Sequence, residues 1–231
     1  MPRGPHLNQP AGRFHPSHHP AIRGRERELR ALADALRRLV AIAVTNTASA
    51  EETGAAAREL EALADRLEPS VPAAIPPRYA PEGTPVDPHD FFQYDVMLGL
   101  YNPLALPIEM EWHPPRALGF ARFTTPYEGP PGCVHGAVLA GAFDQVFNVA
   151  NLKSGSAGPT RELRLEYLRP TPLHQDLVFE AQVERVEGRE ITTAGRVRCG
   201  DSVTVEARGR FIMLSRERVQ QMARAGRPTE G

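Results

Sequence analysis

Asp144 is the residue of this chain whose surroundings most demand a chemical explanation, because it stands in an apolar run. Apart from Asp144, only His135, Gln145 and Asn148 interrupt a run of Val, Leu, Ala, Phe and Gly between residues 134 and 150. An ionised carboxylate in such surroundings costs several kcal/mol unless it is paired or hydrogen-bonded. Asp144 is therefore either a structural aspartate bonded to a neighbouring backbone or hydroxyl group, or a general base or nucleophile whose environment tunes its basicity.

A second chemical feature precedes Asp144 at His135, Gly136 and Ala137, after a turn rich in proline and glycine. If a helix begins here, its first turn presents free amide N–H groups and the positive end of the helix dipole. Gly136 and Ala137 carry almost no side chain, so a substrate carbonyl can reach their amides and an oxyanion would be stabilised there. His135 either caps and orients this turn or takes part in the chemistry. A nucleophilic pair with Cys133 is a further interpretation, which an ordinary buried thiol explains equally well.

The elements that must hold these residues follow from the hydrophobic pattern. A helix that is apolar nearly all the way round, here at residues 134–150, is expected to be wrapped on most sides. Alternation typical of strands precedes it at residues 108–113 and around residues 118–123. After the helix the alternation returns in four stretches, the last three joined by short turns: 162–167, 177–186, 191–199 and 203–213. The sequence therefore predicts an α+β domain in which a curved antiparallel sheet surrounds one central helix.

The spacing of the two features limits how they can act together. Gly136 and Asp144 are eight residues apart, which is about 12 Å along a helix axis. They cannot both touch one reacting carbon if they belong to the same helix, so two helices must contribute. A two-fold dimer with antiparallel central helices would place Asp144 of one subunit near Gly136 of the other and form two equivalent composite sites.

The N-terminal part of the chain has a different organisation. Residues 1–22 contain five prolines and four histidines; they predict a disordered tail, to which we assign no metal site. Residues 23–68 show helical spacing on both sides of a turn and predict a helical hairpin, whose apolar stripe should pack on the main domain or on a second subunit. Residues 69–88 contain seven prolines and predict an extended linker. The main domain is expected at residues 89–215, and a short helix and tail at residues 216–231.

Composition excludes several classes of function. The 27 basic and 28 acidic side chains give a formal charge of −1, so the chain lacks the positive charge that drives non-specific binding to nucleic acid or anionic membranes. No stretch approaches the roughly 20 apolar residues that span a bilayer. The two cysteines, Cys133 and Cys199, form no disulfide or zinc pattern, and the N-terminus has no secretory signal. We expect a cytoplasmic protein without a metal or cofactor, bound to neither nucleic acid nor membrane.

The run EGPPGCVHGAVLAGAFD, residues 128–144, resembles a motif of the hotdog-fold acyl-CoA thioesterases, EGPPG-x-x-HGG followed by six residues and an aspartate. The likeness is to the phenylacetyl-CoA thioesterase type and to thioesterase superfamily members. The next segment, GPTRELRLEYLRPTPL, resembles the family's following strand, with a threonine at its start and an aromatic-x-x-P end. The likeness extends over residues 91–214. One departure is Ala137, which replaces the second glycine but retains the backbone N–H.

This resemblance implies a hotdog fold and hydrolysis of an acyl-CoA thioester. It assigns the oxyanion amides to Gly136 and Ala137, the base or nucleophile to Asp144, and the positioning of the attacking water to Thr160. A homodimer is expected, with a dimer of dimers as a further arrangement. The coenzyme phosphates need positive charge nearby, for which the candidates are Lys153, Arg161, Arg164 and Arg169. The alternatives are a non-catalytic acyl-CoA-binding hotdog protein, which would have no use for Asp144, and a hotdog dehydratase or hydratase.

Overall fold

The computed structural model describes residues 21–73 and 93–214. The predicted tail up to residue 20, most of the predicted linker and the short helix and tail predicted at residues 216–231 lie outside this part of the chain. Ile22, which the sequence placed in the tail, is fully buried. The packed part of the chain therefore includes this residue.

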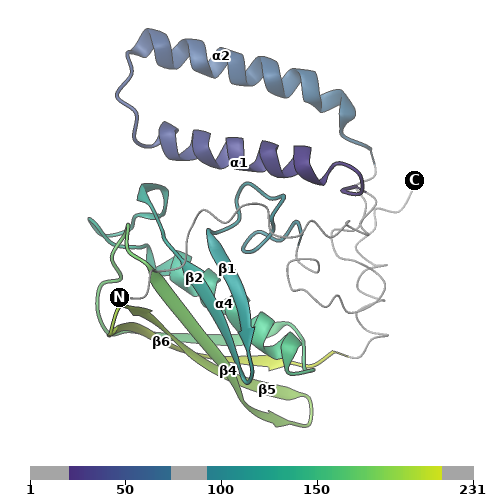
Figure 1. Cartoon of the computed structure of the whole chain (residues 1–231), viewed down its shortest axis with the longest axis vertical. Coiled ribbons are helices and arrows are strands. Elements are labelled where there is room, and N and C mark those ends of the chain that lie inside the picture. Colours follow the sequence, from purple (N-terminus) through teal and green to yellow (C-terminus); the bar gives the residue numbers. More distant parts are fainter. Residues whose placement is uncertain (1–20, 74–92, 215–231) are drawn as a thin grey trace.

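A six-stranded antiparallel sheet forms the main body of the molecule (Figure 1). Its spatial order is β1-β2-β4-β5-β6-β3, so the predicted meander is the run β4-β5-β6 and β3 forms one edge. The second strand begins earlier than predicted, at Arg116, because Pro114 and Pro115 form the tight turn that joins it to the first. The strands are β1 (Ile108–His113), β2 (Arg116–Ala121), β3 (Thr160–Tyr167), β4 (Leu177–Glu187), β5 (Glu190–Cys199) and β6 (Ser202–Ile212).

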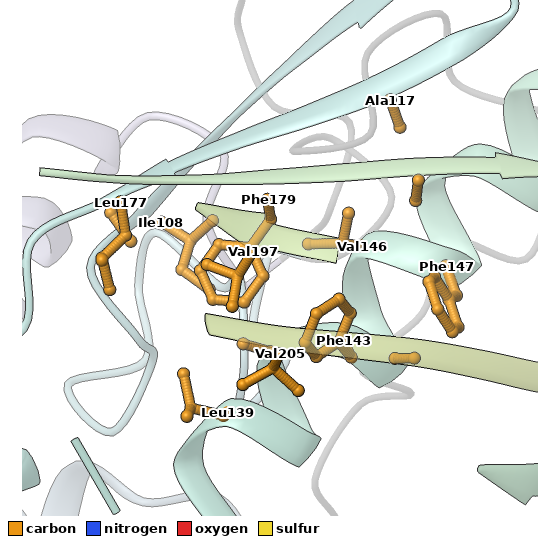
Figure 2. Packing of buried hydrophobic residues seen from close by; sticks show 14 of the residues in the cluster. Ile108, Ala117, Leu139, Phe143, Val146, Phe147, Leu177, Phe179, Val197 and Val205 are labelled. Atoms are coloured by element: carbon orange, nitrogen blue, oxygen red, sulfur yellow. The ribbon is translucent and has the colours of Figure 1, made fainter. Parts of the chain in front are cut away.

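One helix, α4 (Gly136–Lys153), packs along the inner face of this sheet. Its buried side chains join those of the strands in one apolar cluster (Figure 2). Phe147 lies over Gly195 of β5 and Gly209 of β6, where an added Cβ would come within 2.7 and 2.8 Å of its ring. Such close contact between a large side chain and two bare backbones lets the sheet curve round the helix. The prediction of one central helix wrapped by an antiparallel sheet is confirmed.

A hairpin of two helices, α1 (Glu26–Ala43) and α2 (Ala50–Leu67), precedes the sheet. The α2 helix begins at a capping box in which Ser49 and Glu52 bond each other's backbone N–H. In Figure 1, α1 lies between α2 and the sheet domain. Arg37 of α1 donates through Nη2 to the carbonyl oxygens of Gly99, Leu100 and Asn102 at 3.2, 3.3 and 2.6 Å.

The apolar stripe of the hairpin is covered only in part. Ala33 is buried, whereas Leu32 and Leu39 of the same helix remain 40% and 38% exposed. Burial of the stripe therefore holds at Ala33 and not along its whole length. None of the helices within residues 21–73 and 93–214 is long and apolar enough to cross a membrane.

Candidate active site

Asp144 and Thr160 are brought together, as the resemblance implied. Thr160 is the first residue of β3, and its hydroxyl donates a hydrogen bond of 2.6 Å to Oδ1 of Asp144. Asp144 is half-buried and lies on the one side of α4 that the sheet does not cover, together with Ala137, Gly141 and Asn148. Its carboxylate is thus partnered and accessible, rather than sealed in the core.

The start of α4 is the second part of the site. His135 is the N-cap residue, and its Nδ1 accepts the N–H of Ala137 at 3.0 Å. The carbonyl of His135 accepts the N–H groups of Val138 and Leu139. Among the described residues, the N–H of Gly136, the first residue of α4, has no hydrogen-bond acceptor. Sequence reasoning expected both amides to face a substrate; in this structure His135 occupies the Ala137 N–H, because its ring lies within reach of the first turn.

The turn before α4 holds His135 in this position. Glu128 accepts the N–H of Gly132 at 2.6 Å, and the N–H of His135 donates to the carbonyl of Tyr127 at 2.9 Å. An added Cβ at Gly129 would lie 2.7 Å from the His135 Cα. Gly132 adopts a φ of 74°, which favours glycine. The proline-glycine pattern is therefore the local reason for the sharp entry into the helix.

Strand β3 connects the two parts of the site. Its first residue, Thr160, bonds Asp144, and its last, Tyr167, donates through its hydroxyl to the carbonyl of Gly136 at 2.9 Å. The carboxylate and the free amide therefore lie at opposite ends of one strand, and eight residues of helix separate them by about 12 Å. Sequence reasoning missed Tyr167, although it noted the aromatic-x-x-P pattern in which this residue stands.

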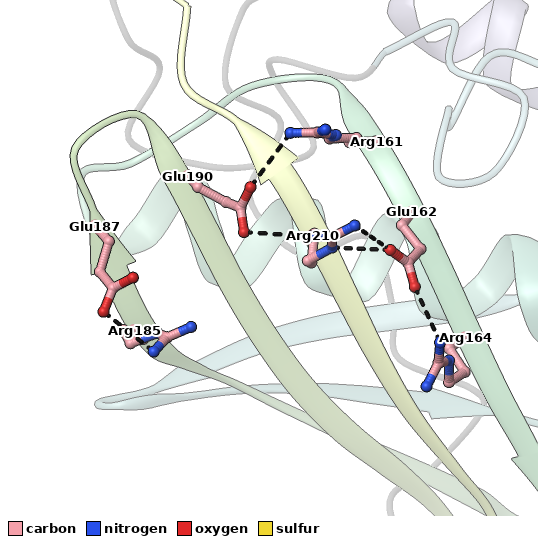
Figure 3. A network of polar contacts seen from close by, with 7 residues as sticks. All are labelled: Arg161, Glu162, Arg164, Arg185, Glu187, Glu190 and Arg210. Atoms are coloured by element: carbon pink, nitrogen blue, oxygen red, sulfur yellow. Dashed lines mark hydrogen bonds and ion pairs between the residues drawn. The ribbon is translucent and has the colours of Figure 1, made fainter.

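The four candidate phosphate-binding cations do not form one cluster. Arg161 follows Thr160 and pairs with Glu190 at 3.4 Å. Arg164 pairs with Glu162 at 3.5 Å and lines a hollow of about 970 Å³ on the sheet face opposite α4. Figure 3 shows both arginines in the ion-pair network on the outside of the sheet. The other two lie at or just after the end of an element: Lys153 is the last residue of α4, and Arg169 comes two residues after β3.

The outer network is held together by Arg210. It pairs with Glu162 and Glu190, and its hydrogen bond with Glu162 raises the pKa of the guanidinium above its ordinary value. Arg164 is thus part of a charged outer face and is remote from Asp144. Within residues 21–73 and 93–214, no three His, Cys, Asp or Glu side chains gather in an arrangement that could hold a metal ion.

Comparison with known proteins places this architecture in a family. A sequence profile of the thioesterase superfamily matches residues 131–208. The acyl-coenzyme A thioesterases THEM4 of Xenopus laevis and Bos taurus are 33% and 34% identical over 92 and 96 residues, or 38% and 40% of this chain. The matches span 41% and 39% of those curated relatives, less than half of their length.

A crystal structure of a thioesterase superfamily protein gives a more extensive match. It is 35% identical, the match covers 80% of this chain and 90% of that chain, and the TM-score is 0.71. The curved antiparallel sheet round α4 is the hotdog fold that the sequence predicted. Since the match covers nearly the whole of that relative at this identity, the chain belongs to the thioesterase superfamily.

Proposed function

We propose that this chain hydrolyses the thioester bond of an acyl-coenzyme A. The observation that carries the proposal is the accessible Asp144 carboxylate held by Thr160 on a helix whose first N–H, at Gly136, is unoccupied among the described residues. The match to relatives named acyl-coenzyme A thioesterases supports the substrate class.

The proposed reaction uses the two features in different roles. The thioester carbonyl oxygen accepts the Gly136 N–H, and the Ala137 N–H can join it when His135 releases that group. Thr160 holds Oδ1 of Asp144, which leaves Oδ2 to take a proton from the attacking water. The tetrahedral intermediate then collapses, the C–S bond breaks, and the proton passes to the coenzyme A thiolate. The products are a carboxylic acid and a free thiol.

A second route begins with attack by Asp144 itself. It would form a mixed anhydride and release the thiolate, after which water would hydrolyse the anhydride. A single turnover in ¹⁸O-labelled water tests for the second route. Label in the Asp144 carboxylate indicates the nucleophilic route with the anhydride opened at the aspartyl carbonyl. Label confined to the product acid fits either the general-base route or an anhydride opened at the acyl carbonyl.

Both routes require the Gly136 amide of a second subunit, because the two features are too far apart within one helix. We propose a two-fold homodimer in which β3 pairs with β3 of the partner. Among the described strands, β3 hydrogen-bonds only with β6, so its other edge is open to pairing. The start of β3 contacts Asp144 and its end contacts Gly136. Antiparallel pairing of two copies of β3 therefore brings the Asp144 end of one subunit toward the Gly136 end of the other.

Charge indicates which register this pairing takes. In an antiparallel pair, residues directly opposite each other point to the same face of the sheet. A two-fold axis normal to the sheet therefore places one residue of β3 opposite its own copy, and we name the axis after that residue. An axis through Arg164 would place this arginine opposite its own copy and Glu162 opposite the partner's Glu166, which is unfavourable. An axis through Leu163 or Leu165 instead places Arg164 opposite a glutamate of the partner.

The Leu163 axis also completes the site. It places the partner's Tyr167 beside Thr160, so that the partner's Gly136 approaches Asp144. An axis through Leu165 would instead place the partner's Tyr167 opposite Leu163, which is three residues, or about 10 Å, along the strand from Thr160. We therefore propose the Leu163 register. The wider assembly, including a dimer of dimers, does not affect this geometry.

A thiol-release assay across acyl-CoAs of graded chain length tests the proposed activity. Asp144→Asn preserves the shape of the side chain and removes the base, so we expect turnover to fall by about 10²- to 10⁴-fold. Asp201→Asn, an exposed residue in the turn between β5 and β6, is the matched control and should retain wild-type turnover. Turnover by Asp144→Asn equal to that of the control would exclude the proposed mechanism.

The non-catalytic alternative is favoured by one observation, because an aspartate satisfied by Thr160 also fits a structural role. Acyl-CoA binding without turnover of any thioester, in wild type and Asp144→Asn alike, would support that alternative. The dehydratase or hydratase alternative needs a histidine that moves protons. Nδ1 of His135 is engaged by the Ala137 N–H, which leaves one ring nitrogen for such a role.

A further inference from the structure

Tyr167 forms a contact that its burial does not explain. The side chain is 53% exposed, yet its hydroxyl reaches the first helical residue of α4 and donates to the Gly136 carbonyl at 2.9 Å. The ring also lies against Gly136, where an added Cβ would come within 3.1 Å of the hydroxyl oxygen. The contact joins the edge strand to the part of the helix that carries the free amide.

This contact is one of two that hold the same peptide group. The carbonyl of Gly136 and the N–H of Ala137 belong to one planar unit. Tyr167 binds the oxygen of this unit, and Nδ1 of His135 binds its N–H at 3.0 Å. The two side chains come from outside the helix, one from the edge strand and one from the N-cap. Together they hold the orientation of a peptide plane in the first turn, where the helix ladder only begins and a glycine leaves the backbone most freedom.

The clamped plane adjoins the free amide. The N–H of Gly136 belongs to the preceding peptide, and fixing the Gly136–Ala137 plane limits the rotation about the Gly136 Cα that a residue without a Cβ otherwise allows. A hydrogen bond to a carbonyl also polarises its peptide group and strengthens the N–H on the other side, which belongs to Ala137. The clamp therefore affects both amides of the first turn.

We propose that Tyr167 is a positioning residue that fixes the Gly136–Ala137 peptide for oxyanion stabilisation; this inference rests on the proposed function. Tyr167 acts through the helix backbone, since its proton is donated to Gly136 and not to a reacting atom. Its role is distinct from that of Thr160, which bonds the carboxylate at the other end of β3.

Tyr167→Phe tests the inference because it removes the hydroxyl and keeps the ring. We expect kcat to fall about tenfold, the effect of one lost hydrogen bond, while KM and the melting temperature stay at wild-type values. Asp201→Asn, in the exposed turn between β5 and β6, is the control. It should leave kcat unchanged. Light scattering on both variants checks that the oligomeric state is preserved.

Amide hydrogen exchange gives a readout that does not depend on activity. We expect NMR to show faster exchange in Tyr167→Phe at Ala137, whose N–H belongs to the clamped peptide, and unchanged exchange in the rest of α4. Unchanged kcat together with unchanged exchange would overturn the inference. A loss of kcat in Tyr167→Phe that is accompanied by a lower melting temperature or by dissociation of the oligomer would also overturn it, because Tyr167 would then have a merely structural role. If wild type hydrolyses no thioester, the proposed function fails, while the exchange data still decide whether Tyr167 clamps this peptide.

Discussion

Replacing Gly136 by proline removes one hydrogen-bond donor from the site with little other change. Gly136 is the first residue of α4, a position that proline suits, and its N–H donates to no described residue. His135 before it has φ −61° and ψ 135°, within the region that a residue preceding proline adopts. The substitution should therefore fold. It deletes the proposed oxyanion donor and adds a Cβ, which Gly136→Ala adds as well.

The expected loss follows from the role of that donor. Removal of one oxyanion donor costs about 10² to 10³ in turnover, or roughly 2.7 to 4 kcal/mol of transition-state stabilisation. Gly136→Ala keeps the N–H and adds a Cβ at 3.1 Å from the Tyr167 hydroxyl. Because the Tyr167 side chain is 53% exposed, it can shift to make room. We expect Gly136→Ala to retain turnover to within about tenfold of wild type.

Steady-state thiol release by the two variants, with melting temperatures measured in parallel, makes the comparison. The proline variant should melt at or slightly above the temperature of the wild type, because it restricts the unfolded chain. Equal turnover by folded Gly136→Pro and Gly136→Ala would refute the assignment of this amide as the oxyanion donor.

Three further substitutions test the scaffold. Glu180→Gln should lower the free energy of unfolding by about 2 kcal/mol, because it removes the charge that two arginines bind. Burial raises the pKa of the Glu180 carboxyl, but Arg196 and Arg198 outweigh burial and hold this pKa below its ordinary value. This contribution is present above pH 4.5 and is lost as pH falls through the lowered folded pKa, so denaturant titrations of variant and wild type should converge in acid. Gly195→Ala would place a Cβ 2.3 Å from the Glu180 carbonyl oxygen and 2.7 Å from the Phe147 ring, and should lower the melting temperature by many degrees; a wild-type melting curve would contradict the packing. Ser49→Ala should weaken α2 by about 1 kcal/mol, visible as faster amide exchange in α2 while the sheet domain stays protected.

The sheet and its central helix could be predicted because their patterns are local. Alternating residues in β4, β5 and β6 and the short turns between them specify a meander, and the apolar run of α4 requires a covering sheet. Only the strand ends were displaced. The sequence also singled out Asp144 and Thr160, because a carboxylate in an apolar helix is conspicuous and the family motif extends to the threonine. The structure brings the two side chains together, and their roles stay predictions.

The remaining features depend on contacts that no local pattern encodes. Tyr167 binds a backbone carbonyl 31 residues away, so its partner is fixed by how β3 lies along α4. The capture of the Ala137 N–H by His135 depends on the direction of an imidazole ring. Alternation alone would put Thr160 on the same outer face as Arg164, and the bulge between Thr160 and Glu162 turns it toward Asp144. Sequence supplies the residue types in these cases, and the tertiary arrangement decides their roles.

Subunit complementation tests the central claim, that each site combines Asp144 of one subunit with Gly136 of the other. Asp144→Asn and Gly136→Pro chains, carrying different affinity tags, are coexpressed and the heterodimer is purified. One of its two sites then carries both changes and the other carries neither. The composite arrangement predicts about half of the wild-type turnover per dimer, although both homodimers are nearly inactive. Turnover of the heterodimer no greater than that of the two homodimers would contradict it.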